Sequence, residues 1–145
     1  MLRFALFFAG LLSITPALAQ KADVYADRGG AIRGYDPVGY FTAGRPVKGS
    51  PQFSHQWRGA TWHFASAENR DRFAAAPEKF APQYGGYCAY GVAQGYAVSI
   101  DPAAWTIVDG KLYLNYSLSV RENWNKDVPG YIRKADANWP GVLKR

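Results

Sequence analysis

The chain has very few residues of the kinds that bind soft metals. Its 145 residues include one cysteine, one methionine and two histidines, and the methionine is the first residue. If the N-terminal segment is removed, the sulfur and imidazole ligands are reduced to His55, His63 and Cys88. A metal site that needs more ligands must take them from oxygen groups, from a partner chain or from a cofactor.

A single cysteine also excludes an internal disulfide bond. Cys88 is therefore either buried and inert, reactive, a metal ligand, or cross-linked to another chain. Free cysteine is among the residue types most often found buried. The sequence leaves these four alternatives open.

Charge is sparse and dispersed. Charged residues make up 19% of the chain, with a formal net charge of +6, and the adjacent basic pairs are Arg133-Lys134 and Lys144-Arg145. This distribution is not the basic stripe of a nucleic-acid-binding protein. We therefore expect no nucleic-acid partner. The hydrophobic content of 48% indicates a folded chain rather than a disordered one.

No apolar run is long enough to cross a bilayer. The N-terminal segment has a basic start with Arg3, a mostly apolar run over residues 4–12, and the small-residue sequence Ala17-Leu18-Ala19 before Gln20. This order is typical of a secretory signal peptide. The sequence therefore predicts a signal peptide at residues 1–19 and a periplasmic or secreted mature chain that begins at Gln20 and has no transmembrane segment.

Asp109-Gly110 marks the clearest hairpin. It separates residues 105–108 from residues 111–116, and both segments have strand composition. Asp-Gly suits the type I′ turn, whose twist matches that of the strands. We therefore predict a two-stranded hairpin at this position.

Arg58-Gly59 marks a second hairpin, between residues 53–57 and 60–64. With a two-residue loop, the aromatic side chains share one face and His63 points to the other face. With a three-residue loop, His55 and His63 share a face, because a shift of one residue inverts the alternation. Clustering of the aromatic side chains favours the first register, which argues against a site shared by the two histidines.

Helix signals lie between and after these hairpins. The predicted elements are a short strand at residues 38–41, a helix at 67–76 capped by Ser66, a helix from Ser119 to about 127, and a helix from Pro129 to Trp139. Together with the hairpins they predict an α+β fold, a small antiparallel sheet of hairpins with short helices packed on it. We expect residues 20–145 to form a single domain with a C-terminal helical extension.

Glycines and tyrosines surround the cysteine in the segment from residue 84 to residue 91. Glycine permits positive φ and close backbone approach, so Cys88 is expected on a tightly shaped segment. Tyrosine is frequent at binding surfaces. Tyr84, Tyr87 and Tyr90 are therefore candidate ligand-binding residues.

Several stretches resemble the YHS domain family. The family pattern has an Asp-Pro-Val sequence, a strand end of the Tyr-x-Phe-Cys-Ser type, a short helix with a Phe, and a Pro-Glu-x-Tyr turn. The corresponding stretches here are Asp36-Pro37-Val38, Trp62-His63-Phe64-Ala65-Ser66, Phe73 and Pro77-Glu78-Lys79-Phe80. Further stretches, such as Tyr84-Gly85-Gly86-Tyr87-Cys88-Ala89, resemble the secreted bacterial members of the family. The resemblance implies a YHS-like α+β fold.

The resemblance also implies metal handling, but with a departure from the family pattern. Metal-handling members carry cysteine at the strand end, where this chain has Ala65, and the following helix has no cysteine. The remaining candidate ligands are Cys88, His63 and His55, a set that suits copper or zinc.

Three functions follow from these residues. The first is soft-metal binding by the exported protein through Cys88 and a histidine. The second is a module that binds a non-metal ligand or a periplasmic protein partner through an aromatic surface. The third is an enzyme with Cys88 as nucleophile and a histidine as base. It ranks last, because the chain has no Cys-x-x-Cys, Gly-x-Ser-x-Gly or phosphate-binding loop, and we assign no catalytic residue.

Overall fold

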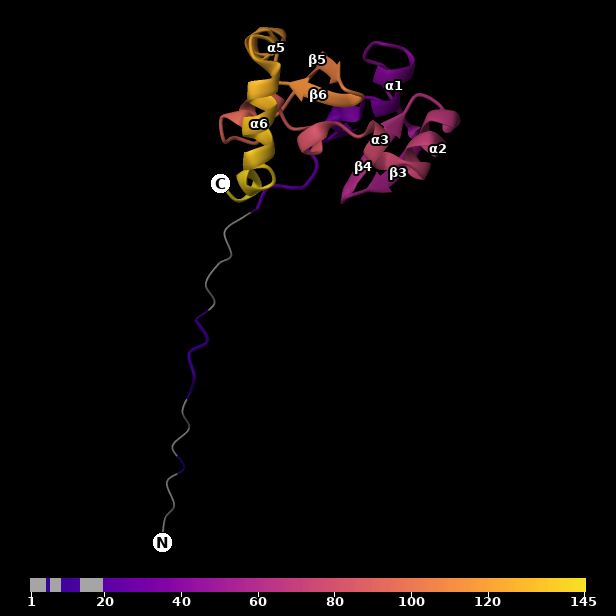
Figure 1. Ribbon diagram of the computed structural model, residues 1–145. Coiled ribbons are helices and arrows are strands. Elements are labelled where there is room, and N and C mark those ends of the chain that lie inside the picture. The colour runs from indigo at the N-terminus through magenta and orange to yellow at the C-terminus, as the bar shows by residue number, and fades with distance from the viewer. Residues whose placement is uncertain (1–4, 6–8, 14–19) are drawn as a thin grey trace.

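The computed structural model describes residue 5, residues 9–13 and residues 20–145 (Figure 1). Residues 1–4, 6–8 and 14–19, which make up most of the predicted signal peptide, lie outside the described residues. Export of the chain therefore stays a prediction. No helix in the described part of the chain is both long and apolar enough to cross a membrane.

Within the described residues, the strands form three separate antiparallel hairpins. They are β1 (Ala26–Asp27) with β2 (Gly30–Ala31), β3 (Ser50–Trp57) with β4 (Ala60–Phe64), and β5 (Asp101–Val108) with β6 (Lys111–Asn115). Helices lie between and after them, so the predicted α+β class is confirmed.

The helices are short. The α-helices are α1 (Pro37–Thr42), α2 (Ala67–Ala75), α3 (Pro77–Phe80), α4 (Ala89–Ala93), α5 (Leu118–Asn125) and α6 (Val128–Asn138). Single 3₁₀ turns cover Ile32–Gly34, Gln83–Gly86 and Gly141–Lys144. The C-terminal helices α5 and α6 follow the last hairpin directly.

Both predicted hairpins are present with the favoured register. Trp57 pairs with Ala60 and His55 pairs with Trp62, so the loop between β3 and β4 has two residues. At the other hairpin, Asp109 has a φ of 51° and Gly110 a φ of 74°, as a type I′ turn requires. The two-residue turns therefore set the register of both strand pairs.

The prediction of a strand at residues 38–41 is wrong, because this segment belongs to helix α1. The Asp36 carboxylate accepts hydrogen bonds from Val38 N and Gly39 N, and Pro37 occupies the first turn. Such a cap and an early proline favour a helix start. The helix predicted from Ser119 begins one residue earlier, at Leu118, because Ser117 accepts the capping hydrogen bond from Val120 N.

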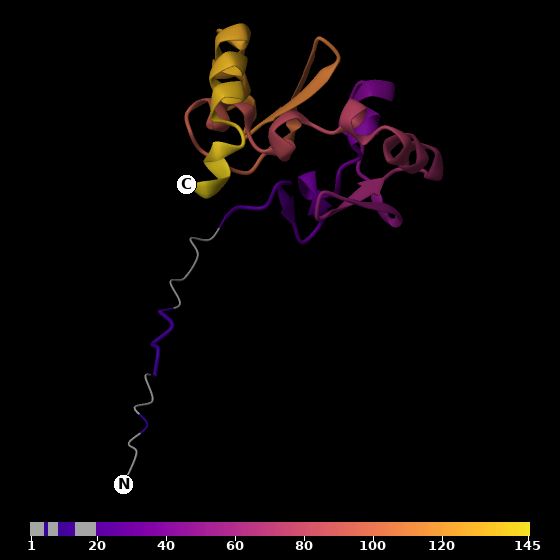
Figure 2. The ribbon, with the colours of Figure 1, turned by 60° about the horizontal axis from the view of Figure 1, so that its bottom comes forward.

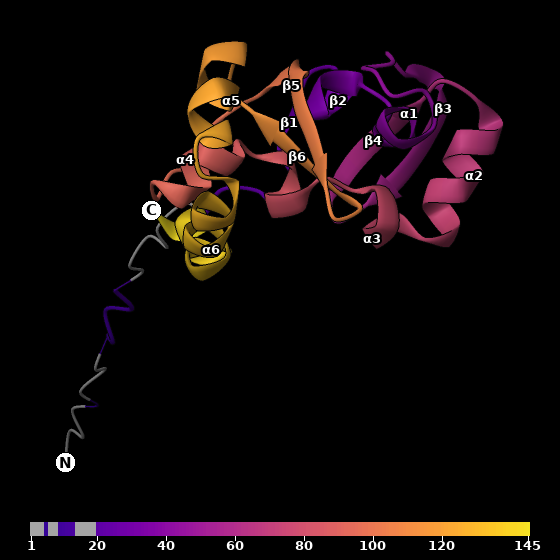
Figure 3. The ribbon, with the colours of Figure 1, turned by 45° about the horizontal axis from the view of Figure 1, so that its top comes forward.

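The buried apolar side chains of residues 20–145 form two core clusters. One contains the aromatic side chains between β3–β4 and α2, with Trp62, Phe64 and Phe73 fully buried. The other includes side chains from helices α4, α5 and α6, among them the fully buried Trp124. Figures 2 and 3 show α5 and α6 at one end of the molecule, β3–β4 and α2 at the other, and the β5–β6 hairpin between them. A cleft lies between these two ends.

Candidate functional site

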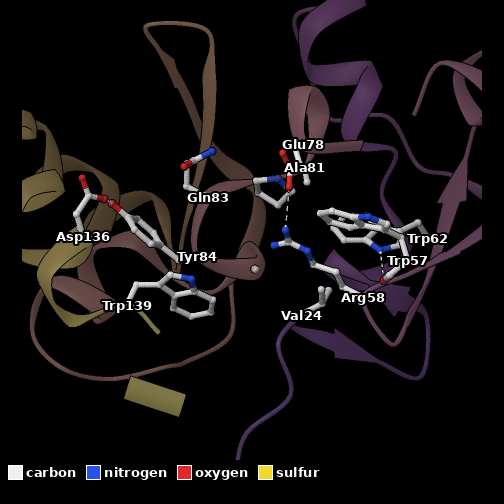
Figure 4. Close-up of a pocket in the computed structure, with 12 residues that line it drawn as sticks. Val24, Trp57, Arg58, Trp62, Glu78, Ala81, Gln83, Tyr84, Asp136 and Trp139 are labelled. Carbon is white, nitrogen blue, oxygen red and sulfur yellow. Dashed lines mark hydrogen bonds and ion pairs between the residues drawn. The ribbon is translucent and has the colours of Figure 1, made fainter. Parts of the chain in front are cut away.

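A cleft of about 410 Å³ lies between the β3–β4 hairpin and the C-terminal helix α6 (Figure 4). Its volume is within the range of small-molecule sites. Three of the five tryptophans of the chain line it, together with charged and amide side chains. The lining residues are Val24, Trp57, Arg58, Trp62, Glu78, Ala81, Pro82, Gln83, Tyr84, Gly85, Asp136 and Trp139.

One side of the cleft, here called the hairpin wall, consists of Trp57, Arg58, Trp62 and Glu78. The Trp57 ring packs against Trp62 with 5.9 Å between ring centroids, and Trp62 Nε1 donates to the Trp57 carbonyl at 3.1 Å. Trp62 is fully buried and supports Trp57 from behind. The Arg58 Cζ lies 4.4 Å from the centroid of the Trp57 ring, and Arg58 Nη2 lies 3.1 Å from Glu78 Oε1.

Arg58 occupies a costly backbone position. Its φ is 48°, in the left-handed region, at the first position of the turn between β3 and β4. Asn, Asp and Gly are preferred at that position of a type I′ turn, and the other hairpin uses Asp109 there. The arginine does not improve the turn, so its presence is better explained by its side chain, which Figure 4 shows between the two sides of the cleft.

The other side, here called the helix wall, consists of Tyr84, Asp136 and Trp139. The Tyr84 hydroxyl donates to Asp136 Oδ1 at 2.8 Å, and the Tyr84 ring lies 6.1 Å from that of Trp139. Tyr84 is buried, whereas Asp136 on α6 is exposed. The wall therefore presents aromatic rings beside a carboxylate.

Left-handed backbone places Tyr84 in this wall. Tyr84, Gly85 and Gly86 have φ values of 58°, 62° and 85°. A left-handed residue other than glycine costs about 1–3 kcal/mol, and such residues cluster at ligand sites. Both sides of the cleft thus contain a non-glycine residue in a strained conformation, Arg58 on one and Tyr84 on the other.

Burial raises the pKa of the Tyr84 phenol, and the hydrogen bond to Asp136 raises it further. The unfolded chain loses this proton near pH 10, while the folded chain keeps it. The stability that Tyr84 contributes is therefore complete below pH 10 and is lost as the pH rises toward the folded pKa. Between pH 10 and 11 we expect the free energy of unfolding to fall by about 1 kcal/mol less in Tyr84→Phe than in the wild type.

Urea unfolding at the two pH values measures this difference. Tyr96→Phe is the matched control, because it removes a tyrosine hydroxyl from a side chain that is 64% exposed. The same loss of stability in Tyr84→Phe and in the wild type would contradict the role given to the buried phenol.

Cys88 lies in the interior, outside the cleft. Its side chain is 1% exposed, and Sγ accepts hydrogen bonds from Gly91 N at 3.3 Å and Tyr116 N at 3.2 Å. Sγ also lies 3.6 Å from Oδ1 of the buried Asn115. Burial raises the pKa of the thiol, against the opposing effect of the backbone donors. Among the alternatives for Cys88, these contacts favour a buried structural residue that caps α4.

The two histidines lie on opposite faces of the β3–β4 hairpin, as the predicted register requires. The His55 ring contacts Phe73, with 6.2 Å between ring centroids. The His63 ring lies against Gly30 and Gly34, where an added Cβ would meet its ring atoms. Glycine at these two positions leaves room for the imidazole.

These positions do not fit the predicted metal site. Within the part of the chain that the structure describes, no group of three or more His, Cys, Asp or Glu side chains could hold a metal ion. Cys88, His63 and His55 each have separate protein contacts. Copper or zinc binding through them stays a prediction that this geometry does not favour.

Of the three candidate tyrosines, only Tyr84 lines the cleft. The Tyr87 hydroxyl donates to the Ala22 carbonyl at 2.7 Å, which holds the N-terminal segment in place. The Tyr90 ring packs on Tyr131 at 5.1 Å. The sequence does not identify Arg58 and Trp139 as site residues. One signal for Arg58 is present, because arginine is unusual in a turn that prefers Asn or Asp.

A second hollow, of about 380 Å³, lies near β1. Its lining is mainly charged, with Asp27, Arg33, Lys48 and Asp101, and includes no tryptophan. The cleft is the better candidate for a ligand site, because small-molecule sites combine apolar and aromatic walls with a few polar groups.

Comparison with known proteins adds one match. Residues 38–84 match the family model of the YHS domain, which supports the resemblance seen in the sequence. The match includes the hairpin wall and Tyr84 but ends before Asp136 and Trp139. No curated protein and no solved structure is significantly similar to the chain. The resemblance to secreted bacterial members stays a prediction.

Proposed function

We propose that this chain, whose residues 38–84 match the YHS domain, is a binding module for a small organic molecule, and that its site is the cleft between the hairpin wall and the helix wall. The observation that carries the proposal is the composition of the cleft, with tryptophan on both sides and three charged side chains among its lining residues. Aromatic surfaces provide large apolar contact area, and a few polar groups orient the ligand.

The geometry favours a ligand with a flat apolar body and a polar or charged end. Trp57 and Trp139 come from opposite sides, so a flat group can contact both. The charged groups Arg58, Glu78 and Asp136 lie at the same cleft and can interact with the other end of the ligand.

Metal handling is the function that the YHS resemblance implies. Binding of copper or zinc through Cys88 and a histidine would need a deprotonated thiol and further ligands. Cys88 is buried and its thiol pKa is raised. For these reasons we prefer the cleft to the cysteine as the site of function.

Calorimetric titration with three phenyl compounds tests the proposal. The probes are benzyltrimethylammonium, benzyl alcohol and benzoate, which present the same ring with a positive, neutral or negative group. We expect at least one to bind, and to bind about tenfold more weakly to Trp57→Leu and to Trp139→Leu, because an aromatic contact is worth about 0.5–1.5 kcal/mol beyond its area.

Trp105→Leu is the control, because Trp105 packs on Tyr40 and does not line the cleft. Circular dichroism would first establish that each variant is folded. The proposal is wrong if none of the three compounds binds, or if replacing either cleft tryptophan in a folded variant leaves the affinity unchanged.

A further inference from the structure

The charges of the cleft differ in sign from those of the chain as a whole. The chain has a net charge of +6, but the cleft is lined by two carboxylates, Glu78 and Asp136, and one guanidinium, Arg58. Aromatic faces attract cations through their quadrupole, and a nearby carboxylate adds to this attraction. The cleft therefore combines two features that favour a positively charged ligand.

Arg58 shows where a cation is held. Its guanidinium lies over the face of Trp57, at 4.4 Å, and pairs with Glu78 at 3.1 Å. The side chains of Arg58 and Glu78 are 53% and 80% exposed. Exposed ion pairs contribute little to stability, so the guanidinium can leave this position at small cost. The contacts it makes are then available to another cation.

The helix wall repeats the same combination. Tyr84 and Trp139 provide rings, and Asp136 provides an exposed carboxylate that is held by the Tyr84 hydroxyl. A ligand between the two walls would have a carboxylate within the cleft on each side. This arrangement suits a ligand with one positive group. A ligand with a negative group would find only one opposite charge among the lining residues, that of Arg58.

We propose that the cleft binds a small organic cation with a flat apolar body, of the quaternary ammonium or guanidinium class, which displaces the Arg58 guanidinium from its position between Trp57 and Glu78. This inference rests on the proposed function, because it names the class of ligand for the same cleft. An anion that pairs with Arg58 is the opposite outcome.

The variant Arg58→Asn separates the two outcomes. Asparagine suits the left-handed turn position, so the hairpin is expected to form at least as well as in the wild type. It also removes the internal competitor. We expect benzyltrimethylammonium to bind Arg58→Asn about fivefold more tightly than the wild type, because the ligand no longer has to break an exposed cation–π contact and an exposed ion pair.

A second substitution tests the carboxylate. In the Arg58→Asn background, adding Glu78→Gln is expected to weaken benzyltrimethylammonium binding about threefold, because the cation loses an exposed counter-charge. Adding Glu68→Gln is the matched control. Glu68 pairs with Arg72 at 2.7 Å on α2, away from the cleft, so this change should leave the affinity as it was.

The results distinguish failure of this inference from failure of the proposed function. Tighter binding of benzoate than of benzyltrimethylammonium, weakened by Arg58→Asn, would overturn the cationic ligand and keep the cleft as a binding site. An unchanged affinity for benzyltrimethylammonium in Arg58→Asn would overturn the displacement of Arg58. Absence of binding by all three phenyl compounds would overturn the proposed function itself.

Discussion

Asp36→Ala is expected to lower the free energy of unfolding by about 3 kcal/mol, because it removes a helix cap worth about 1 kcal/mol and leaves a buried donor without a partner, which costs about 1–3 kcal/mol. Asp36 is fully buried. One carboxylate oxygen accepts from Val38 N and Gly39 N at the start of α1, at 2.9 and 3.3 Å. The other accepts from Ala65 N at 2.9 Å and Asn69 Nδ2 at 2.8 Å. Alanine would remove an acceptor from four donors, of which Gly39 N keeps the Asp36 carbonyl at 3.2 Å and the other three lose the bond.

The free energy of unfolding of Asp36→Asn is expected to lie between that of Asp36→Ala and that of the wild type. Its one amide oxygen can replace one carboxylate oxygen, while its NH₂ group would face donors on the other side. Asp71→Asn, at an exposed ion pair with Arg70, is the control and should change the stability by less than about 0.5 kcal/mol. Urea denaturation measures all three variants. A free energy of unfolding for Asp36→Ala within 1 kcal/mol of the wild-type value would contradict the role of Asp36 as a buried acceptor. That margin is about fivefold in the folding equilibrium.

The contacts of Asp36 give the Asp-Pro-Val sequence a structural role. Asp36 connects the start of α1 to the segment between β4 and α2, which are distant in sequence. Ser66 caps α2 in the same region by accepting from Asn69 N at 3.1 Å. Two of the stretches that resemble the YHS family are therefore joined by one carboxylate, which gives them a structural role.

Gly85→Ala is expected to destabilise the fold by about 3 kcal/mol, combining a left-handed backbone with overpacking. Gly85 has a φ of 62°. A Cβ at this position would overlap the Asp23 carbonyl oxygen and come within 3.3 Å of the Trp139 ring. The Gly85 carbonyl also accepts from Tyr25 N at 2.9 Å, so the backbone cannot easily move away.

Gly110→Ala separates the two contributions. Gly110 has a similar φ of 74°, but an added Cβ would meet nothing within 4 Å. It should therefore cost only the backbone strain, about 1–2 kcal/mol. Thermal and urea unfolding of both variants measure the difference. Equal destabilisation by the two substitutions would show that close packing between Gly85, Asp23 and Trp139 does not matter.

Local sequence signals predicted much of the fold. Asp109-Gly110 and Arg58-Gly59 each predict a two-residue turn, and the turn geometry then fixes the register of the strands. Ser66 and Pro129 mark helix starts that the structure confirms to within a residue or two. The apolar composition of segment 38–41 suits a strand, but the cap by Asp36 makes it a helix.

The cleft could not be predicted in the same way. Trp57 and Arg58 are far in sequence from Asp136 and Trp139, and only tertiary packing brings the two walls together. The scarcity of metal ligands makes Cys88 the prominent candidate in the sequence, but its burial depends on contacts with Asn115 and Tyr116 from β6 and the loop after it. Residue counts limit the available chemistry, but they do not show which side chains share a site.

The central claim is that one ligand contacts both walls of the cleft. The most direct test is to follow the indole N–H resonances of the tryptophans by NMR while benzyltrimethylammonium is added. We predict that the Trp57 and Trp139 signals shift together and saturate with a single dissociation constant, while the signal of the fully buried Trp124 stays in place. Signals that do not move, or that move for only one of the two walls, would contradict the claim.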